Sequence, residues 1–268
     1  MDASGPNQFV HKTYIQVSTE EDDERCWITG MTSLNSNQLI LADSKNISLK
    51  LVDLSKNSVI DQLKLDNYPL DVTALDDGEC AVTVPVEQTI HFISVTEETL
   101  TFSDEKLQVE GDCRGLYFYG KRLLVTYGCP SKLQILELNG TVLKTVMINS
   151  MQYLIFSEPY YVTATNNHII VSDLGQSEIT RLNWNGEVLE SFTTDGSPHG
   201  VAVIENGFLF VAGSHIKQCN NQNEIDNVVT DLEFPYAIVY SETNRFLFVS
   251  FHKGYSKNDN YLQVLERM

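Results

Sequence analysis

The sequence predicts an all-β protein folded as a six-bladed β-propeller, and three observations support this prediction. Short apolar strand patterns run through the whole 268-residue chain. The heads of these patterns recur at intervals of about 40 residues, the length of one propeller blade. Asn-Gly turns at residues 139–140 and 185–186 separate strands in which polar and apolar residues alternate. Such a turn is a strong hairpin signal, because both of its residues must accept positive φ.

Chain length and the two chain ends set the expected domain organisation. All-β chains of this size commonly form one unit, so we expect a single domain over residues 10–268 after a flexible tail at residues 1–9. The first strand is expected at residues 10–18, and the charged sequence TEEDDER at residues 19–25 is expected to form a solvated loop.

The ends of the chain are also expected to complete the ring. The sixth blade stops after its third strand, at residues 261–265, and the strand at residues 10–18 has nothing before it to pair with. We predict that residues 13–17 pair with residues 261–265. This pairing closes the ring with an N-terminal strand and removes two exposed sheet edges.

Each blade is expected to open with an inner strand that can be aligned with the others. The six heads are ITGMTSL from Ile28, PLDVTAL from Pro69, CRGLYFY from Cys113, PYYVTAT from Pro159, PHGVAVI from Pro198 and PYAIVYS from Pro235. Proline is tolerated at a strand's first residue, which need not donate to the ladder. A second strand follows each head, apolar on both faces as expected between neighbouring blades. The stretch at residues 213–235 is short, so the outer strand of blade five is expected to be missing or shortened.

Charge disfavours nucleic acid as a partner. The chain carries 18 basic and 36 acidic residues, for a formal net charge of −18. Such a surface repels phosphate backbones and lacks the cations whose binding releases counterions. The basic residues are scattered, with Lys121-Arg122 as the only adjacent pair.

The sequence favours a cytoplasmic protein without membrane contact. It has no apolar run of 18 residues, and its N-terminus lacks the apolar core of a signal peptide. The five cysteines are widely spaced, with no Cys-x-x-Cys pair: Cys26, Cys80, Cys113, Cys129 and Cys219. This usage favours a reducing compartment and buried thiols over disulfides or a zinc site.

Several of these patterns resemble the NHL repeat. Pro-x-Gly-Val-Ala-Val at residues 198–203, Val-Ser-Asp at residues 171–173 and the two Asn-Gly turns match its elements. The resemblance runs from about Trp27 to the C-terminus and is to the C-terminal propeller of tripartite-motif (TRIM) proteins. It implies a six-bladed ring that binds targets for a ubiquitin ligase. The family's aspartate after the second strand is kept as Asp43 and Asp173. The other aligned positions hold Val84, Tyr127, Gly213 and Ser250.

Missing motifs lead us to expect a non-catalytic recognition domain. A ubiquitin ligase needs a RING with paired Cys/His zinc ligands, and the sequence has no such cluster. It also lacks glycine-rich phosphate loops and the Gly-x-Ser-x-Gly nucleophile elbow. We therefore expect no catalytic residues, no cofactor and no metal. The expected partner is a protein or peptide, bound by a monomeric domain.

The binding residues are expected at one mouth of the propeller. Arginine and tyrosine are common interface anchors, because they combine contact area with directional hydrogen bonds. The second residue of each head lines this mouth, and residues just after the second strands lie nearby. The candidates are Arg114, Tyr127, Tyr160, His199, Tyr236 and Phe251. The same rings could simply seal the central channel, and the sequence leaves both interpretations open.

Two further functions remain open. The first is a metal-dependent six-bladed propeller enzyme of the lactonase or lyase type, for which His199, His215 and His252 are the available ligands. The aligned mouth positions, which include Thr29 and Leu70, suit a peptide better than a cation. The second is RNA binding by an NHL-like domain, which needs stacking aromatics and a basic patch. Among the aligned mouth positions the only basic residue is Arg114.

Overall fold

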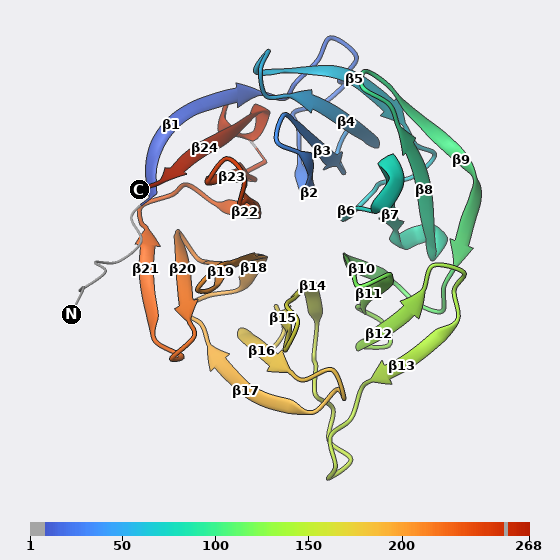
Figure 1. Ribbon diagram of the computed structural model, residues 1–268, viewed down its shortest axis with the longest axis vertical. Coiled ribbons are helices and arrows are strands. Elements are labelled where there is room, and N and C mark those ends of the chain that lie inside the picture. Colours follow the sequence, from blue (N-terminus) through green and yellow to red (C-terminus); the bar gives the residue numbers. More distant parts are fainter. Residues whose placement is uncertain (1–8, 255–256) are drawn as a thin grey trace.

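The computed structural model describes residues 9–254 and 257–268, which form small, almost wholly antiparallel sheets around a central axis (Figure 1). The strands are β1 (Phe9–Gln16), β2 (Ile28–Asn35), β3 (Gln38–Asp43), β4 (Ser48–Asp53), β5 (Ser58–Lys64), β6 (Val72–Ala74), β7 (Glu79–Val84), β8 (Thr89–Val95), β9 (Leu100–Gln108), β10 (Cys113–Tyr119), β11 (Arg122–Tyr127), β12 (Lys132–Glu137), β13 (Val142–Val146), β14 (Pro159–Ala164), β15 (Ile169–Asp173), β16 (Glu178–Leu182), β17 (Val188–Thr193), β18 (Pro198–Ile204), β19 (Gly207–Ala212), β20 (His215–Asn220), β21 (Ile225–Val229), β22 (Pro235–Ser241), β23 (Phe246–Phe251) and β24 (Tyr261–Arg267).

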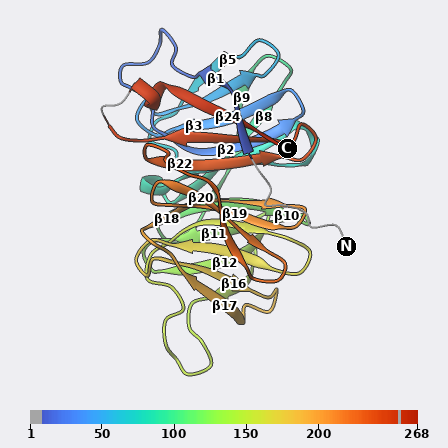
Figure 2. The same ribbon diagram turned by 90° about the vertical axis from the view of Figure 1, so that its left-hand side faces the viewer.

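Short 3-10 helices connect some of these strands: η1 (Asp76–Gly78), η2 (Pro85–Glu87) and η3 (Lys257–Asn260). Figure 2 shows the sheets from the side, with the loop between β13 and β14 extending beyond the body of the molecule. No helix in residues 9–254 and 257–268 is long and apolar enough to cross a membrane.

The strands group into units of four. Four sheets have four strands each: β6 to β9, β10 to β13, β14 to β17 and β18 to β21. The fifth sheet has the order β2-β3-β4-β5-β1-β24-β23-β22. In the strand pairing of the described residues, its two halves are joined by one parallel pair, Gln16 of β1 with Ser58 of β5.

The predicted pairing of the chain ends is confirmed. β1 runs antiparallel to β24, with Thr13 opposite Val264 and Gln16 opposite Tyr261. Ile15 and Leu262 face each other in this pair and are both buried in the core. The apolar alternation of β1 therefore has the packing partner that its sequence requires.

The predicted burial of the second strands is also confirmed. Residues 39–42 of β3 are all 0% exposed, and the second strands of the other units are similarly buried. Hydroxyl groups on these strands also connect neighbouring units. Thr83 Oγ1 donates to the Arg114 carbonyl at 2.7 Å, and Thr126 Oγ1 donates to the Tyr160 carbonyl at 2.7 Å. Ser250 Oγ donates to the Ile28 carbonyl at 2.9 Å and so joins the last unit to the first.

The third head residues alternate between glycine and a larger residue around the axis. The glycines are Gly30, Gly115 and Gly200, and the residues of the units between them are Asp71, Tyr161 and Ala237. A Cβ atom at Gly30 would lie 2.6 Å from the Asp71 Cα, and one at Gly115 would lie 2.8 Å from the Tyr161 Cα. Both distances are too short for carbon atoms. Glycine is therefore needed where the backbones of adjacent inner strands approach most closely.

The loop at residues 19–25 is not wholly solvated, which corrects the prediction. Asp22 reaches inward and accepts a hydrogen bond from Lys50 Nζ at 2.6 Å. Lys50 also contacts Asp43 Oδ2 at 2.7 Å, and both the lysine and Asp43 side chains are 0% exposed. A buried ammonium group needs counter-charges. Asp43 alone does not provide enough acceptors, so the loop supplies the second carboxylate.

Two other expectations concern blade five and the N-terminal tail. The outer strand of blade five is present as β21, and its five residues match the length of β13. The predicted tail at residues 1–9 falls largely outside the described residues. Its last residue, Phe9, belongs to β1 and is buried. Four cysteines are buried as expected, whereas Cys129 is exposed.

Candidate functional site

The inner strands all begin at the same face of the ring, which we call the mouth face. Two neighbouring cavities open there. One has a volume of about 540 Å³ and is lined by Trp27, Arg114, Glu158 and Tyr160 among others. We call it the Arg114 cavity. The other, the His199 cavity, has a volume of about 440 Å³, and His199, Tyr236 and His252 contribute to its wall.

Aromatic contacts hold the His199 cavity together. The ring centroids of His199 and Tyr236 lie 4.4 Å apart. His252 stacks on Trp27 with a centroid distance of 4.1 Å and an interplanar angle of 11°. Since Trp27 lines the Arg114 cavity and His252 lines the His199 cavity, this stack forms part of the wall between them.

Both histidines of this cavity keep one nitrogen without a protein partner. The Nδ1 atoms of His199 and His252 are buried and have no hydrogen-bond partner among the described residues. Burial lowers the pKa of His199 to about 4. Burial also lowers the pKa of His252, against the opposing charge of Asp259. Both imidazoles are therefore neutral at pH 7, and each ring carries one nitrogen lone pair.

A tyrosine pair separates the two cavities. The hydroxyls of Tyr160 and Tyr236 lie 3.1 Å apart and share a hydrogen bond. Beneath them, the Tyr161 hydroxyl donates to the Thr29 carbonyl at 2.5 Å and so connects β14 with β2 across the axis. Burial raises the pKa of all three tyrosines, so each keeps its proton and can donate it in a hydrogen bond.

Arg114 is held by its neighbours. Its Nη1 contacts Glu158 Oε1 at 2.8 Å, and its Nε contacts Asp112 Oδ2 at 3.1 Å. The guanidinium carbon also lies 5.2 Å from the centre of the Tyr160 ring. Two carboxylates fix this cation at the edge of the cavity. A ligand would meet an arginine whose orientation is already set.

The structure brings together four of the six predicted binding residues. Arg114 and Tyr160 line one cavity, and His199 and Tyr236 line the other. Whether these residues bind a partner stays a prediction.

The remaining two predicted residues do not lie in either mouth cavity. Tyr127 is 0% exposed and packs in a core cluster with Cys113 and Leu116. Phe251 is 3% exposed and packs against Phe9 and Leu265. Both side chains point between neighbouring sheets, because the last residue of a second strand still belongs to the buried strand. A partner at the mouth face could not contact them without disrupting the core.

Sequence reasoning missed Trp27 and Glu158 as parts of this site. Each directly precedes an inner strand, Trp27 before β2 and Glu158 before β14. The residue before each head is thus a mouth position too. The sequence signal was available, since the residue before each head can be aligned in the same way as the heads themselves.

The mouth histidines do not form a metal-binding cluster. Among residues 9–254 and 257–268, the group of three close donors consists of Asp22, Cys26 and Asp43. Lys50 Nζ already lies at the centre of that group, 2.6 Å from Asp22, 2.7 Å from Asp43 and 3.2 Å from the Cys26 sulfur. The lysine ammonium takes the place that a cation would occupy. The donor set for the metal-dependent alternative is therefore not assembled, and no catalytic step is assigned to a metal.

No protein-family profile and no curated protein matches the sequence. The fold, however, is similar to that of solved structures. The virginiamycin B lyase from Staphylococcus aureus is 11% identical, with a TM-score of 0.68 over 97% of this chain and 100% of the lyase. A catalytically inactive histidine-to-alanine variant of the same lyase, solved with quinupristin, is 13% identical, with a TM-score of 0.64 over 98% and 99% of the two chains. A protein of unknown function from Bacteroides thetaiotaomicron is 12% identical, with a TM-score of 0.74 over 96% of this chain and 75% of that one.

These similarities show a β-propeller-like fold, and they correct one expectation. We expected a non-catalytic domain because no familiar catalytic motif is present. That expectation is wrong, because the similar propellers include a lyase, so the missing motifs do not exclude catalysis on this fold. None of these similarities points to a TRIM protein. At 11–13% identity, the comparisons show a β-propeller-like fold.

Proposed function

We propose that the chain is an enzyme-type, six-bladed propeller. It binds a small cyclic organic substrate in the His199 cavity and opens the ring of this substrate by a lyase-type or lactonase-type reaction. One observation carries this proposal: two buried, neutral histidines line one cavity beside a protonated tyrosine, and the Nδ1 atom of each histidine has no hydrogen-bond partner among the described residues. Buried polar atoms without partners are rare in folded proteins, and functional sites are where they are expected.

The proposed blade count rests on the grouping of the strands. Four sheets count as one blade each, and the eight-stranded sheet counts as two, because a single parallel residue pair joins its halves. In this interpretation β1 is the outer strand of the sixth blade. It closes the ring, as the sequence predicts.

The residues of the His199 cavity suit proton transfer. An elimination needs a group that accepts a proton from carbon and a donor that stabilises the negative charge on oxygen. His252 is the better acceptor, because the charge of Asp259 opposes the effect of burial on its pKa. Protonating His199 at pH 7 would cost about 4 kcal/mol, because its pKa is near 4. His199 is therefore assigned the role of a hydrogen-bond acceptor for the substrate, and the Tyr236 hydroxyl that of the donor.

The solved lyases support a histidine in this role. The Staphylococcus aureus enzyme is inactive when one histidine is replaced with alanine. In the present chain, His199 and His252 are the histidines that line a mouth cavity. The present chain and the lyase are thus compared by fold and by residue type, histidine. The comparison does not identify the substrate of the present chain.

A product analysis tests the proposal. The protein is incubated with quinupristin and with a panel of aliphatic and aromatic lactones, and the products are analysed by mass spectrometry. Elimination leaves the mass of an opened ring unchanged, whereas hydrolysis adds one water. We expect turnover of at least one compound, lost in His199→Ala and His252→Ala. His168→Ala, outside both mouth cavities, is the matched control and should retain full activity. Absence of turnover across the panel, or full activity in the double variant His199→Ala/His252→Ala, would contradict the proposal.

Recognition of a peptide or protein at the same face is a second candidate. Two large aromatic residues at the cavities support it: Tyr68 is 41% exposed and Phe234 is 55% exposed. Exposed aromatic side chains around a concave face are typical of interface anchors. If this candidate holds, partner capture is lost in Tyr68→Ala/Phe234→Ala, while His199→Ala captures the same partner as wild type.

A further inference from the structure

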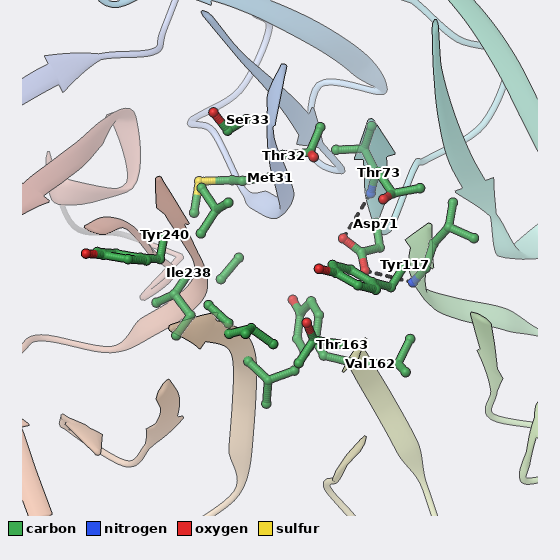
Figure 3. A pocket seen from close by; sticks show the side chains of 18 residues that line it. Met31, Thr32, Ser33, Asp71, Thr73, Tyr117, Val162, Thr163, Ile238 and Tyr240 are labelled. Atoms are coloured by element: carbon green, nitrogen blue, oxygen red, sulfur yellow. Dashed lines mark hydrogen bonds between the residues drawn. The ribbon is translucent and has the colours of Figure 1, made fainter. Parts of the chain in front are cut away.

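A third cavity lies on the propeller axis and is separate from the mouth cavities. This axial channel has a volume of about 210 Å³ and is lined by residues from β2, β10, β14, β18 and β22 together with Asp71 and β6 (Figure 3). On the mouth side it is closed by Tyr161, whose hydroxyl bonds to Thr29 across the axis, and by the Tyr160–Tyr236 pair above it. A cavity that holds one water molecule needs a volume of only about 10–15 Å³. The channel therefore has room for a molecule of several non-hydrogen atoms.

A carboxyl group points into this channel without a cationic partner. Asp71 is 7% exposed. Its Oδ1 accepts the Val72 N–H at 2.9 Å and its Oδ2 accepts the Leu116 N–H at 2.9 Å. No lysine, arginine or histidine lines the channel, and no ion pair of the described residues involves Asp71. Charged groups are rarely buried unless they are paired.

The contrast with Asp43 shows what Asp71 lacks. Asp43 is also buried, but Lys50 lies 2.7 Å from its carboxylate. For Asp71, burial raises the pKa to about 7, and the two backbone N–H groups offset only part of this effect. Near neutral pH the carboxyl is thus divided between its charged and neutral forms. A bound cation would shift it to the charged form.

The channel wall is polar around Asp71 and mostly apolar across from it. In Figure 3, Asp71, Thr73 and Tyr117 lie on one side, and Met31, Ile238 and Tyr240 lie on the other, where Ser33 also lies. Thr73 Oγ1 accepts the Phe118 N–H at 3.0 Å, which leaves its own hydroxyl proton free to turn toward the channel. A ligand that matches this wall has a polar head and an apolar body.

We propose that the axial channel binds a small organic ammonium ion, with its N–H groups donating to the Asp71 carboxylate and its carbon chain against Met31 and Ile238. A primary alkylammonium offers three donors and an apolar tail, so it matches both sides of the wall. A calcium ion would require six to eight oxygen ligands, and a half-apolar wall with one carboxylate does not supply them. The site is independent of the function proposed for the mouth face.

This assignment carries a pH dependence. Binding needs the charged form of Asp71, so affinity should fall as pH drops through the pKa near 7, by about tenfold between pH 8 and pH 6. The groups that face Asp71 from the packed elements do not titrate in this range. Tyr117, Tyr160, Tyr161, Tyr236 and Cys80 have pKa values raised by burial and stay neutral. Arg114 stays charged and is held by Asp112 and Glu158.

Calorimetric titration with n-butylammonium chloride tests the proposal. We expect saturable binding at pH 8 that weakens about tenfold at pH 6. n-Butanol has the same chain without the charge, and potassium chloride has the charge without the chain, so neither should bind. Glu158→Gln is the matched control, because it removes a carboxylate from the mouth face, and its affinity should equal that of wild type.

Two variants of the channel complete the experiment. Asp71→Asn should abolish binding, but the new amide NH2 faces the Leu116 N–H whenever it replaces Oδ2, which disturbs the fold. Val203→Phe therefore serves as the second variant, since Val203 lines the channel and is only partly buried, and the change leaves Asp71 intact. Loss of binding in Val203→Phe, with an unchanged melting temperature, supports the channel as the site. No saturable binding to wild type, binding retained in Val203→Phe, loss of binding in Glu158→Gln, or equal binding of n-butanol would overturn the proposal.

Discussion

Replacing the buried Lys50 in the first sheet is the most direct test of how much its ion pairs contribute to the stability of the fold. Lys50 Nζ contacts Asp22 at 2.6 Å and Asp43 at 2.7 Å, and the three side chains are 0%, 3% and 0% exposed, respectively. Replacing Lys50 with methionine keeps most of the side-chain volume but leaves two buried carboxylates without a cation. Removal of one partner from a buried ion pair costs about 3–5 kcal/mol. For a chain of this size, that loss corresponds to a fall in melting temperature of about 6–20 °C.

The pH dependence of this variant separates the charge effect from lost packing. Burial alone would raise the pKa of Asp22, but hydrogen bonds from Lys50 and from the Thr19 backbone outweigh it and lower the pKa. In the wild type, the stability from this group is present above the ordinary aspartate pKa and is lost as pH falls through the lowered one. In Lys50→Met the carboxylates are unfavourable when charged, so acid neutralises the penalty. The stability difference between the two proteins should therefore narrow as pH falls toward 4.

Urea unfolding, followed by tryptophan fluorescence, measures both effects. Lys56→Met is the matched control, because Lys56 pairs with Asp53 at the surface and its side chain is 53% exposed. Its unfolding midpoint should equal that of wild type, since exposed pairs contribute little. A loss of less than about 1 kcal/mol in Lys50→Met, or a difference that does not change with pH, would refute the assigned role of the cluster.

Three further predictions concern the ring and the mouth. Ser250→Ala removes the donor to the Ile28 carbonyl and leaves a buried group unsatisfied, so urea unfolding should show a loss of about 1–3 kcal/mol, whereas Ser191→Ala on an outer strand should show little change. Deleting residues 1–20 removes β1 and exposes the edge of β24, so the truncated protein should lose cooperative melting in calorimetry; an unchanged transition would contradict ring closure by β1. His199 should titrate by NMR near pH 4, and because its pKa is lowered in the folded state, it should destabilise the fold progressively as pH falls from about 6.5 to 4; a midpoint above 6 would contradict its burial.

The four-stranded units and the pairing of the chain ends could be read from the sequence, because strand patterns are local and each exposed strand edge needs a partner. The heads, the apolar second strands and the pairing of β1 with β24 follow from strand periodicity and from the need to cover sheet edges. Much of the candidate site could not be predicted in the same way. A register shift follows the first residue of four inner strands: β10, β14, β18 and β22. Such a shift changes the side to which the next side chains point, so strict alternation does not predict their direction.

Tyr127 and Lys50 illustrate what the sequence leaves undecided. Tyr127 ends a strand and could point either to the mouth or between sheets, and only the packing of Cys113 and Leu116 against it settles the choice. Lys50 reads as an outward residue of an alternating strand, yet the structure buries it, because it pairs with Asp43 on the neighbouring strand and with the loop residue Asp22. The approach of the loop to Lys50 leaves no local pattern in the sequence. Asp71 can likewise be identified in the sequence as the third residue of its head. The sequence does not indicate that Asp71 lacks a cationic partner.

The alternation of glycine with larger residues around the axis also limits how such a ring can change during evolution. At each of these glycines a Cβ atom would lie too close to the backbone of the following inner strand, as at Gly30 with Asp71 and Gly115 with Tyr161. Duplicating or deleting a single repeat would place two glycines or two larger residues side by side. A change of two consecutive repeats would preserve the alternation and keep a glycine at each of these close approaches.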